Sequence, residues 1–145
     1  RMRIWVDEQR KLAGRLPRRY PSVEEAFKRM QDENKHLSPE RARHLTEHGV
    51  NQNEDGTFSW KFDNYVRSWP AYDMAVPEVE QLWSRITCPT LLVYGSESGA
   101  SNPSVDGRAR HLKNATVVSI DGAGHWVHHD QFEVFMNHVY EFLDD

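Results

Sequence analysis

Two short apolar runs in the last third of the chain predict buried strands that lie parallel to each other. Residues 90–95, Thr-Leu-Leu-Val-Tyr-Gly, and residues 115–120, Ala-Thr-Val-Val-Ser-Ile, have the near-continuous apolar character of strands covered on both faces. A short helix is predicted between them at residues 105–112, and a longer one from Asp130 to about Leu143. Because strands alternate with helices here, we expect parallel strands joined by right-handed crossovers.

The chain before residue 86 has helical patterns and polar loops. Ser22 with Glu25 three residues later has the pattern of a capping box. Ser38-Pro39 opens another helix, which Gly49 is expected to end in a left-handed conformation. Helices are also expected at residues 1–14 and 77–86, and a small hairpin or turn around Asp55-Gly56 within residues 50–62.

Composition narrows the class of protein. The 145 residues suit one domain of ordinary size, but only 38% are hydrophobic and the mean hydropathy is −0.79. We therefore expect part of the chain to bury apolar surface against something outside it. Cys88 is the only cysteine, so no internal disulfide can form. No apolar run is long enough for a signal peptide or a membrane span, which predicts a cytoplasmic protein that does not engage a membrane.

The charge distribution argues against nucleic-acid binding. The net charge is −4, although residues 1–48 hold 12 Lys and Arg against 8 Asp and Glu. Charges of both signs are interleaved there, as on solvated helix faces, and no glycine-rich or aromatic-rich basic stretch accompanies them. We therefore expect no nucleic-acid partner.

The loop after the second predicted strand carries the candidate chemistry. It reads Asp121-Gly-Ala-Gly-His-Trp126, so His125 lies just beyond the carboxyl end of a strand, where open α/β sheets place their chemistry. A histidine there can accept and return a proton near neutral pH. Glu97 follows the first strand and could accept a hydrogen bond from the imidazole, which would fix its tautomer.

On these residues the chain resembles the second half of an α/β-hydrolase. The matching segments are residues 88–95, Cys-Pro-Thr-Leu-Leu-Val-Tyr-Gly, residues 122–126, Gly-Ala-Gly-His-Trp, and residues 128–131, His-His-Asp-Gln. Residues 1–85 resemble the helical cap of that family, and residues 86–145 its C-terminal lobe. The resemblance implies a partial α/β-hydrolase fold, in which a helical cap precedes a strand–helix–strand–helix unit with parallel strands.

Two departures from the family pattern bear on the mechanism. The family's nucleophile sits in a Gly-x-Ser-x-Gly elbow, whereas the one comparable motif here, residues 95–99, has Glu97 at its centre. The family commonly places its acid where this chain has Ser98, so Glu97, one position earlier but one methylene longer, becomes the candidate acid. Asp106 and Asp121 are weaker candidates, and the acid could also come from the absent half.

The resemblance implies a hydrolase that acts on an ester or a related bond. His125 would be the general base, Glu97 its orienter, and Trp126 and Trp60 contacts for a small, apolar substrate. The nucleophile, Ser or Asp, would come from a missing N-terminal lobe, and no metal or organic cofactor is implied. An Asp nucleophile would instead open epoxides or remove halide. The alternative from another class is a non-catalytic half-fold or interaction module.

Two further patterns have competing interpretations. His44-Leu-Thr-Glu-His48 matches the H-x-x-E-H pattern of some zinc peptidases, but Glu40 and Arg41 make the same helix face look solvated, so we expect no metal there. Aromatic residues are dense over residues 50–73 and could line a substrate pocket or form the core of the cap. The tryptophans considered for such a pocket are Trp5, Trp60, Trp69 and Trp83.

Overall fold

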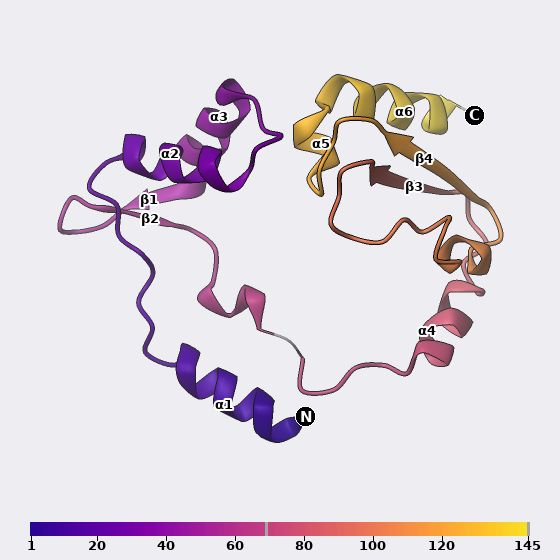
Figure 1. Ribbon diagram of the computed structural model, residues 1–145, viewed down its shortest axis with the longest axis horizontal. Coiled ribbons are helices and arrows are strands. Elements are labelled where there is room, and N and C mark those ends of the chain that lie inside the picture. The colour runs from indigo at the N-terminus through magenta and orange to yellow at the C-terminus, as the bar shows by residue number, and fades with distance from the viewer. Residues whose placement is uncertain (69, 145) are drawn as a thin grey trace. The chain divides into compact units, whose positions relative to one another are not determined.

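The computed structural model describes residues 1–68 and 70–144, which form two compact units (Figure 1). The first unit spans Arg1–Asp73 and the second Met74–Asp145. The helix that begins near Pro77 therefore belongs to the second unit by its contacts. The assignment of residues 1–85 to a cap and of residues 86–145 to a catalytic core stays a prediction.

The first unit combines helices with a small antiparallel sheet. Its β strands pair with Val50 opposite Trp60 and Gln52 opposite Phe58, which confirms the hairpin expected around Asp55-Gly56. Its elements are α1 (Met2–Leu12), α2 (Val23–Glu33), α3 (Pro39–Gly49), β1 (Val50–Gln52), β2 (Phe58–Trp60) and the 3₁₀ turn η1 (Asn64–Arg67).

Side-chain caps start α2 and α3 as the sequence predicts. The Ser22 hydroxyl accepts a hydrogen bond from the backbone N–H of Glu25 at 3.2 Å, and Ser38 accepts one from Arg41 at the same distance. Each cap satisfies one of the N–H groups that a helix start leaves without an intrahelical partner. The Glu25 carboxylate turns to Lys28 Nζ at 3.0 Å, and this hydrogen bond raises the pKa of Lys28 above its ordinary value.

The left-handed conformation expected at Gly49 is wrong. Positive φ occurs at Gly14, Gly56, Gly107 and Gly122, but not at Gly49. α3 instead runs straight into β1, with Val50 already extended at φ −106°. A Cβ on Gly49 would lie 2.8 Å from the Trp60 ring, so glycine leaves room for that ring and does not serve through its φ.

Two hydrophobic clusters hold the first unit together. Tyr20, Ala26 and Val50 are buried with Phe58 and Trp60 packed against them. Tyr20 and Phe58 also exchange two backbone hydrogen bonds at 2.8 Å, which ties the start of α2 to the hairpin. The second cluster lies between α2 and α3 and contains Phe27, Leu37 and Ala42, with Met30 and Leu45 packed against it.

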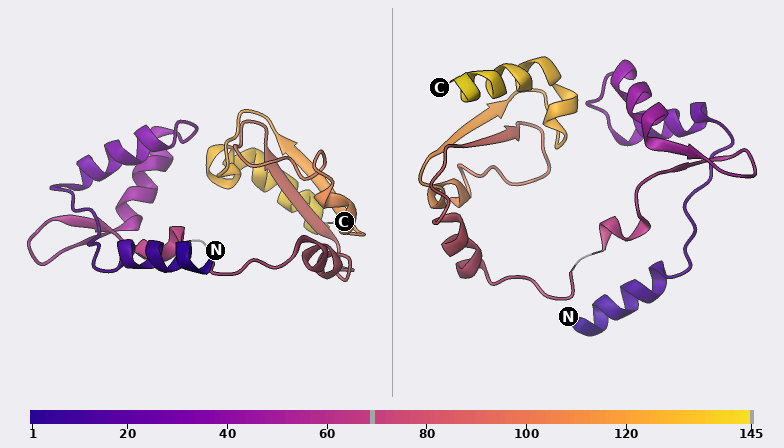
Figure 2. Two further views of the ribbon diagram at one scale, coloured as in Figure 1. Left: turned by 60° about the horizontal axis from the view of Figure 1, so that its bottom comes forward. Right: turned by 180° about the vertical axis from the view of Figure 1, so that it is seen from behind.

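The second unit is built on one pair of parallel strands, as predicted. β3 (Thr90–Gly95) and β4 (Ala115–Ile120) pair in register from Thr90 opposite Ala115 to Gly95 opposite Ile120. The two views of Figure 2 agree that the C-terminal helix lies along this pair, and it contacts both strands. The other elements are α4 (Val76–Trp83), the 3₁₀ turn η2 (Arg108–His111), α5 (Val127–Asp130) and α6 (Phe132–Asp144).

The helices of this unit differ from expectation in their bounds. The helix expected at residues 105–112 is the single 3₁₀ turn η2, and the C-terminal helix begins earlier, as α5, before continuing as α6. α6 has an apolar stripe of half-buried residues at helical spacing, whereas Val134, Tyr140 and Leu143 are exposed. Those stripe residues are Phe132, Phe135, Val139 and Phe142.

Burial of the two strands is incomplete. Every residue of β3 from Thr90 to Tyr94 is half-buried, and only Gly95 is fully buried. In β4 only Ile120 is buried, in a cluster with Ala123 and Val127. The sequence predicted strands covered on both faces, and the described residues of this unit do not provide that cover. None of the helices in the described part of the chain has the length and apolar character needed to cross a bilayer.

The end of β3 lies directly against the loop that follows β4. A Cβ on Gly95 would lie 2.1 Å from the carbonyl oxygen of Gly124 and 2.5 Å from that of Ala123. These are backbone atoms, which cannot move aside as a flexible side chain can. Glycine at position 95 is therefore a condition for the observed path of the loop that carries His125.

We expect the Gly95→Ala variant to lose about 1–3 kcal/mol of stability in the second unit, because the added methyl group displaces this loop. Gly99→Ala is the matched control, since nothing lies within 4 Å of a Cβ there and Gly99 does not have a positive φ. Amide hydrogen exchange in β3 and β4, followed at increasing urea concentrations, gives the free energy of unfolding of this unit in both variants. Equal stabilities for the two would contradict the close approach at Gly95.

Candidate active site

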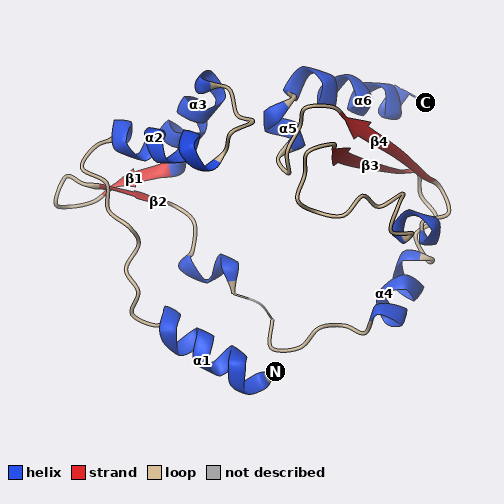
Figure 3. Cartoon of the chain, viewed as in Figure 1, coloured by secondary structure: helices blue, strands red, loops and turns tan. Residues whose placement is uncertain are grey.

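The loops that leave β3 and β4 are joined by hydrogen bonds at the carboxyl edge of the strand pair, where Figure 3 shows both arrowheads. Ser96 N–H donates to the Ile120 carbonyl and Glu97 N–H to the Ala123 carbonyl, both at 3.0 Å. The Gly122 N–H in turn donates to the Ser96 hydroxyl at 3.0 Å. The parallel pairing thus continues past the strands and fixes one side of the His125 loop.

The other side of this loop is held by α5 and the residue after it. Gly122 turns the chain with a φ of +67°, which L residues with side chains rarely adopt. The buried Gly124 N–H donates to Asp130 Oδ2 at 2.9 Å, and Gln131 Nε2 contacts the Gly122 carbonyl at 3.5 Å. The backbone that precedes His125 is therefore anchored from both β3 and α5.

The His125 ring meets a side chain from the end of β3. Ser98 Oγ lies 3.2 Å from His125 Nδ1, across the gap between the two loops. Ser98 Oγ also accepts a hydrogen bond from the Ala100 N–H at 3.2 Å. The histidine and the serine are both accessible, with His125 exposed and Ser98 half-buried. With Nδ1 engaged, Nε2 is the ring nitrogen that would meet a reacting group.

Glu97, the expected orienter, lies beside this contact. Its backbone is fixed by the bond to Ala123 and its side chain is exposed. The side chain within hydrogen-bonding distance of Nδ1 is that of the next residue, Ser98. The structure thus brings Glu97 and His125 to the same edge, while the catalytic roles of both residues stay predictions.

The two weaker acid candidates lie in different surroundings. The Asp106 carboxylate is held within its own loop by Arg108 N–H at 3.0 Å and by the Ser101 hydroxyl at 2.7 Å. These hydrogen bonds, with the one from the Arg108 backbone contributing most, hold the pKa of Asp106 below its ordinary value. Asp121 is exposed, directly after β4.

The aromatic residues expected to contact substrate lie in different units. Trp126 is 39% exposed next to His125, and its ring meets His129 edge-on with centroids 5.9 Å apart. Trp60 is half-buried against the Tyr20 cluster and stacks on Phe62, with centroids 6.5 Å apart. Trp69 lies outside the described residues. The substrate-binding role of Trp126 and Trp60 stays a prediction.

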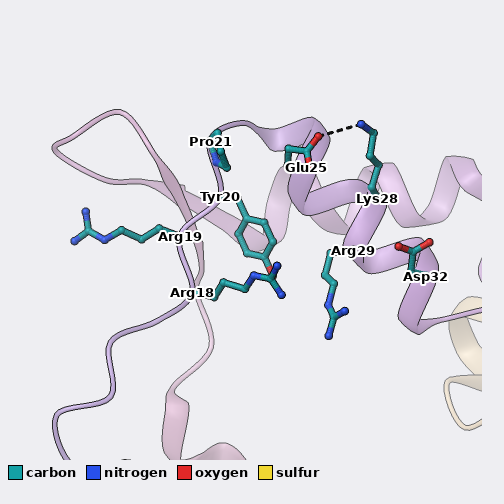
Figure 4. A pocket seen from close by; sticks show the side chains of 8 residues that line it. All are labelled: Arg18, Arg19, Tyr20, Pro21, Glu25, Lys28, Arg29 and Asp32. Atoms are coloured by element: carbon teal, nitrogen blue, oxygen red, sulfur yellow. Dashed lines mark hydrogen bonds and ion pairs between the residues drawn. The ribbon is translucent and has the colours of Figure 1, made fainter.

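A hollow of about 330 Å³ lies on the first unit and is polar (Figure 4). Several of its charges already have partners, since Lys28 pairs with Glu25 and Arg19 with Asp55, while the Arg18 guanidinium lies 5.2 Å from the centre of the Tyr20 ring. Such a lining does not suit an apolar substrate. The lining residues are Arg18, Arg19, Tyr20, Pro21, Glu25, Lys28, Arg29 and Asp32.

The histidine pair on α3 is exposed. The rings of His44 and His48 lie 4.5 Å apart at their centroids. Among the residues that the structure describes, no group of three or more His, Cys, Asp or Glu side chains is arranged to hold a metal ion. The expectation that this pair binds no structural metal stays a prediction.

Two curated proteins are similar to parts of the chain in sequence. Epoxide hydrolase 1 of Caenorhabditis elegans is 38% identical over 58 residues, which cover 39% of this chain and 14% of that protein. The sn-1-specific diacylglycerol lipase ABHD11 of Mus musculus is 32% identical over 90 residues, 61% of this chain and 28% of that protein. The chain thus matches less than a third of either relative's length, and no family model matches it.

Solved structures of hydrolases share the fold at low sequence identity. An esterase of Mycobacterium tuberculosis superposes with a TM-score of 0.77 at 17% identity, over 97% of this chain and 48% of its own. E-2-(acetamidomethylene)succinate hydrolase gives 0.75 at 18% identity, over 89% and 48%. An α/β-hydrolase of Novosphingobium aromaticivorans gives 0.58 at 15%, over 81% and 44%. The chain therefore has a partial α/β-hydrolase fold and spans about half the length of these structures.

Two side-chain contacts at this site are not predicted by the sequence. The first is Ser98, which stands where the family places its acid and which contacts the imidazole of His125. The second is the Asp130 carboxylate, which accepts the Gly124 N–H. Its place six residues after that glycine carries no recognisable signal, because the contact depends on how α5 folds back on the loop.

We expect Asp130→Ala to weaken the His125 loop, because the buried Gly124 N–H loses a charged acceptor at a cost of about 1–3 kcal/mol. Asp130→Asn should retain most of the stability, since its amide oxygen can still accept. Asp121→Ala, in the same loop but exposed, is the control. Hydrogen exchange of the Gly124 amide measures the effect. Unchanged protection in Asp130→Ala would show that this bond does not hold the loop.

Zinc is expected to leave the thermal stability of the chain unchanged apart from weak surface effects, because His44 and His48 supply two ligands where structural zinc sites use four. A thermal melt with and without added zinc, on the chain and on the His44→Ala/His48→Ala variant, provides the measurement. A large zinc-dependent rise that disappears in the double variant would overturn this expectation.

Proposed function

We propose that the chain is the part of an α/β-hydrolase that supplies the general base, and that the complete enzyme cleaves an ester or a related bond. The observation that carries the proposal is the geometry at the strand edge. His125 follows β4, its loop is fixed from both sides, and its Nδ1 is engaged by Ser98 from the neighbouring loop. A base held through one ring nitrogen can use the other to accept a proton and return it.

The nucleophile comes from outside these 145 residues. No Gly-x-Ser-x-Gly or Gly-x-Asp-x-Gly elbow occurs in the sequence, and Gly95-Ser-Glu-Ser-Gly99 has Glu97 at the central position. The half-buried strands of the second unit support a companion lobe, since parallel sheets are ordinarily covered on both faces. The same lobe would supply the apolar contacts that the low hydrophobic content leaves unmade.

In this mechanism Nε2 of His125 removes the proton of a serine hydroxyl as its oxygen attacks the ester carbonyl. The imidazolium then gives that proton to the leaving alcohol, and a second cycle with water releases the acid and restores the serine. With an aspartate nucleophile, His125 would instead activate the water that cleaves the enzyme ester. The two sequence relatives are named as an epoxide hydrolase and a lipase, which supports keeping both classes of reaction.

Trp126, exposed next to the base, would contact a small apolar substrate, and Trp60 would do so from the cap. Glu97 at the same edge remains the carboxylate that could stabilise the imidazolium. The enzyme is proposed to act in the cytoplasm without a metal or organic cofactor.

We expect the chain alone to hydrolyse short- and long-chain p-nitrophenyl esters no faster than background, because an imidazole without a nucleophile is a poor ester catalyst. Joined to a lobe that carries the elbow, it should be active, and His125→Ala should lower kcat by about 10³-fold or more. His128→Ala, an exposed histidine three residues on, is the matched control and should keep its activity.

Two outcomes would contradict parts of this proposal. His125-dependent turnover by the isolated chain would exclude an external nucleophile, and full activity of the complete His125→Ala protein would exclude this base. The reading frame gives a further test. A strand followed by Gly-x-Ser-x-Gly or Gly-x-Asp-x-Gly upstream of Arg1 supports the enzyme, whereas a start codon at or near Arg1 without a companion gene favours the non-catalytic module.

A further inference from the structure

The geometry points to Ser98 as the positioning residue of His125, a neutral hydroxyl that fixes the ring in the tautomer with its proton on Nδ1. This inference rests on the proposed function, in which Nε2 must be free of a proton to act as the base. Ser98 Oγ and His125 Nδ1 lie 3.2 Å apart. In this inference the ring nitrogen donates the hydrogen bond and the hydroxyl oxygen accepts it.

Ser98 is itself held in place by the end of β3. Its N–H donates to the Gly95 carbonyl at 3.0 Å, which closes a tight turn at the strand end. Its carbonyl lies 3.5 Å from the Tyr94 hydroxyl, and its Oγ accepts from Ala100 N–H. Since Gly95 in turn lies against the loop of His125, the serine and the histidine are positioned by the same backbone contact.

The capacity of the hydroxyl explains why one direction suits catalysis. A serine hydroxyl has one proton to donate and two lone pairs that accept. The Ala100 N–H occupies one lone pair, and Nδ1–H of the ring would occupy the other. Nε2 then carries a lone pair at rest and a proton after reaction, while the bond at Nδ1 is the same in both states. If the hydroxyl donated to Nδ1 instead, the ring proton would sit on Nε2 and block the base.

A serine differs from a carboxylate because it orients the ring without a compensating charge. The imidazolium donates a hydrogen bond to the Ser98 hydroxyl oxygen but meets no full negative charge at that atom. Replacing Ser98 with aspartate should therefore add an electrostatic attraction that the native residue lacks. The effect of Ser98→Asp on the protonation of the His125 ring therefore tests a positioning role, because a merely structural role would change the fold and not the protonation of the ring.

The experiment is ¹⁵N NMR of the chain labelled at histidine, which reports which ring nitrogen carries the proton. In the native chain we expect His125 at high pH with Nδ1 protonated and Nε2 not. Ser98→Ala should lose this preference, and Ser98→Thr should keep it because the hydroxyl remains. In Ser98→Asp the ring should take up its second proton at a pH higher by about one unit or more. Glu97→Gln tests the neighbouring carboxylate as the alternative orienter, and the inference expects it to leave the tautomer unchanged.

Three results would overturn the inference. These are a native ring protonated mainly on Nε2, a Ser98→Ala chain with the native tautomer, and a Glu97→Gln chain that changes the tautomer as much as Ser98→Ala does. Amide resonances of β3 and β4 in each variant establish that the fold is intact. Should Ser98→Ala unfold the second unit, Ser98→Thr and Glu97→Gln still decide, because a tautomer that follows the carboxylate and not the hydroxyl rejects the inference.

The two proposals fail separately. The tautomer is measured without substrate or nucleophile, whereas the hydrolase proposal is tested by turnover in the complete protein and by His125→Ala. A native chain with the Ser98-dependent tautomer but no esterase or epoxide hydrolase activity when complete would retain the positioning role and reject the function. An active enzyme whose His125 tautomer ignores Ser98 would do the reverse.

Discussion

The candidate site depends on the approach of two backbone segments, Gly95 at the end of β3 and the Ala123–Gly124 peptide after β4. The close approach leaves no room for a Cβ at position 95, and it occurs because the parallel register sets Gly95 opposite Ile120. Hydrogen bonds from Ser96 and Glu97 then extend the pairing beyond the strands. A loop that is built onto a sheet in this way can hold an exposed imidazole in a defined position, because its backbone has few alternatives.

The contacts that anchor the His125 loop all come from the second unit, whereas the proposed reaction also needs residues from outside it. Gly124 and Gly122 are held by Asp130, Gln131 and Ser96, all from the same unit as His125. These contacts hold the His125 loop from within the second unit. The proposed nucleophile and substrate pocket would have to be formed with further residues packed against the half-buried strands. In the proposed enzyme, this lobe would hold the base in place and another part of the protein would supply the nucleophile.

Sequence patterns predicted the elements best where one physical signal dominated. The apolar runs at residues 90–95 and 115–120 identified both strands and their parallel pairing, and Ser22 and Ser38 identified two helix starts. The sequence pattern wrongly predicted a left-handed conformation at Gly49. A glycine that leaves room for the Trp60 ring cannot be told apart in the sequence from one that adopts a positive φ. The contact between Ser98 and His125 lay beyond such patterns, because it joins residues 27 positions apart through a turn whose direction no local pattern encodes.

A neutral partner at Nδ1 of His125 would affect a serine nucleophile and an aspartate nucleophile differently. In ester cleavage by serine, the imidazolium forms next to a developing oxyanion, and a carboxylate on Nδ1 ordinarily stabilises it. In the proposed enzyme, Ser98 at that position would supply orientation without charge, so the stabilising charge would have to come from Glu97 or from the companion lobe. An aspartate nucleophile is already ionised and needs no proton removed for its attack, and His125 then serves chiefly to activate water. In the proposed enzyme, the neutral partner at Nδ1 would therefore weaken the first step of the serine route more than that of the aspartate route. Which of the two reaction classes applies would then depend on where the stabilising carboxylate lies.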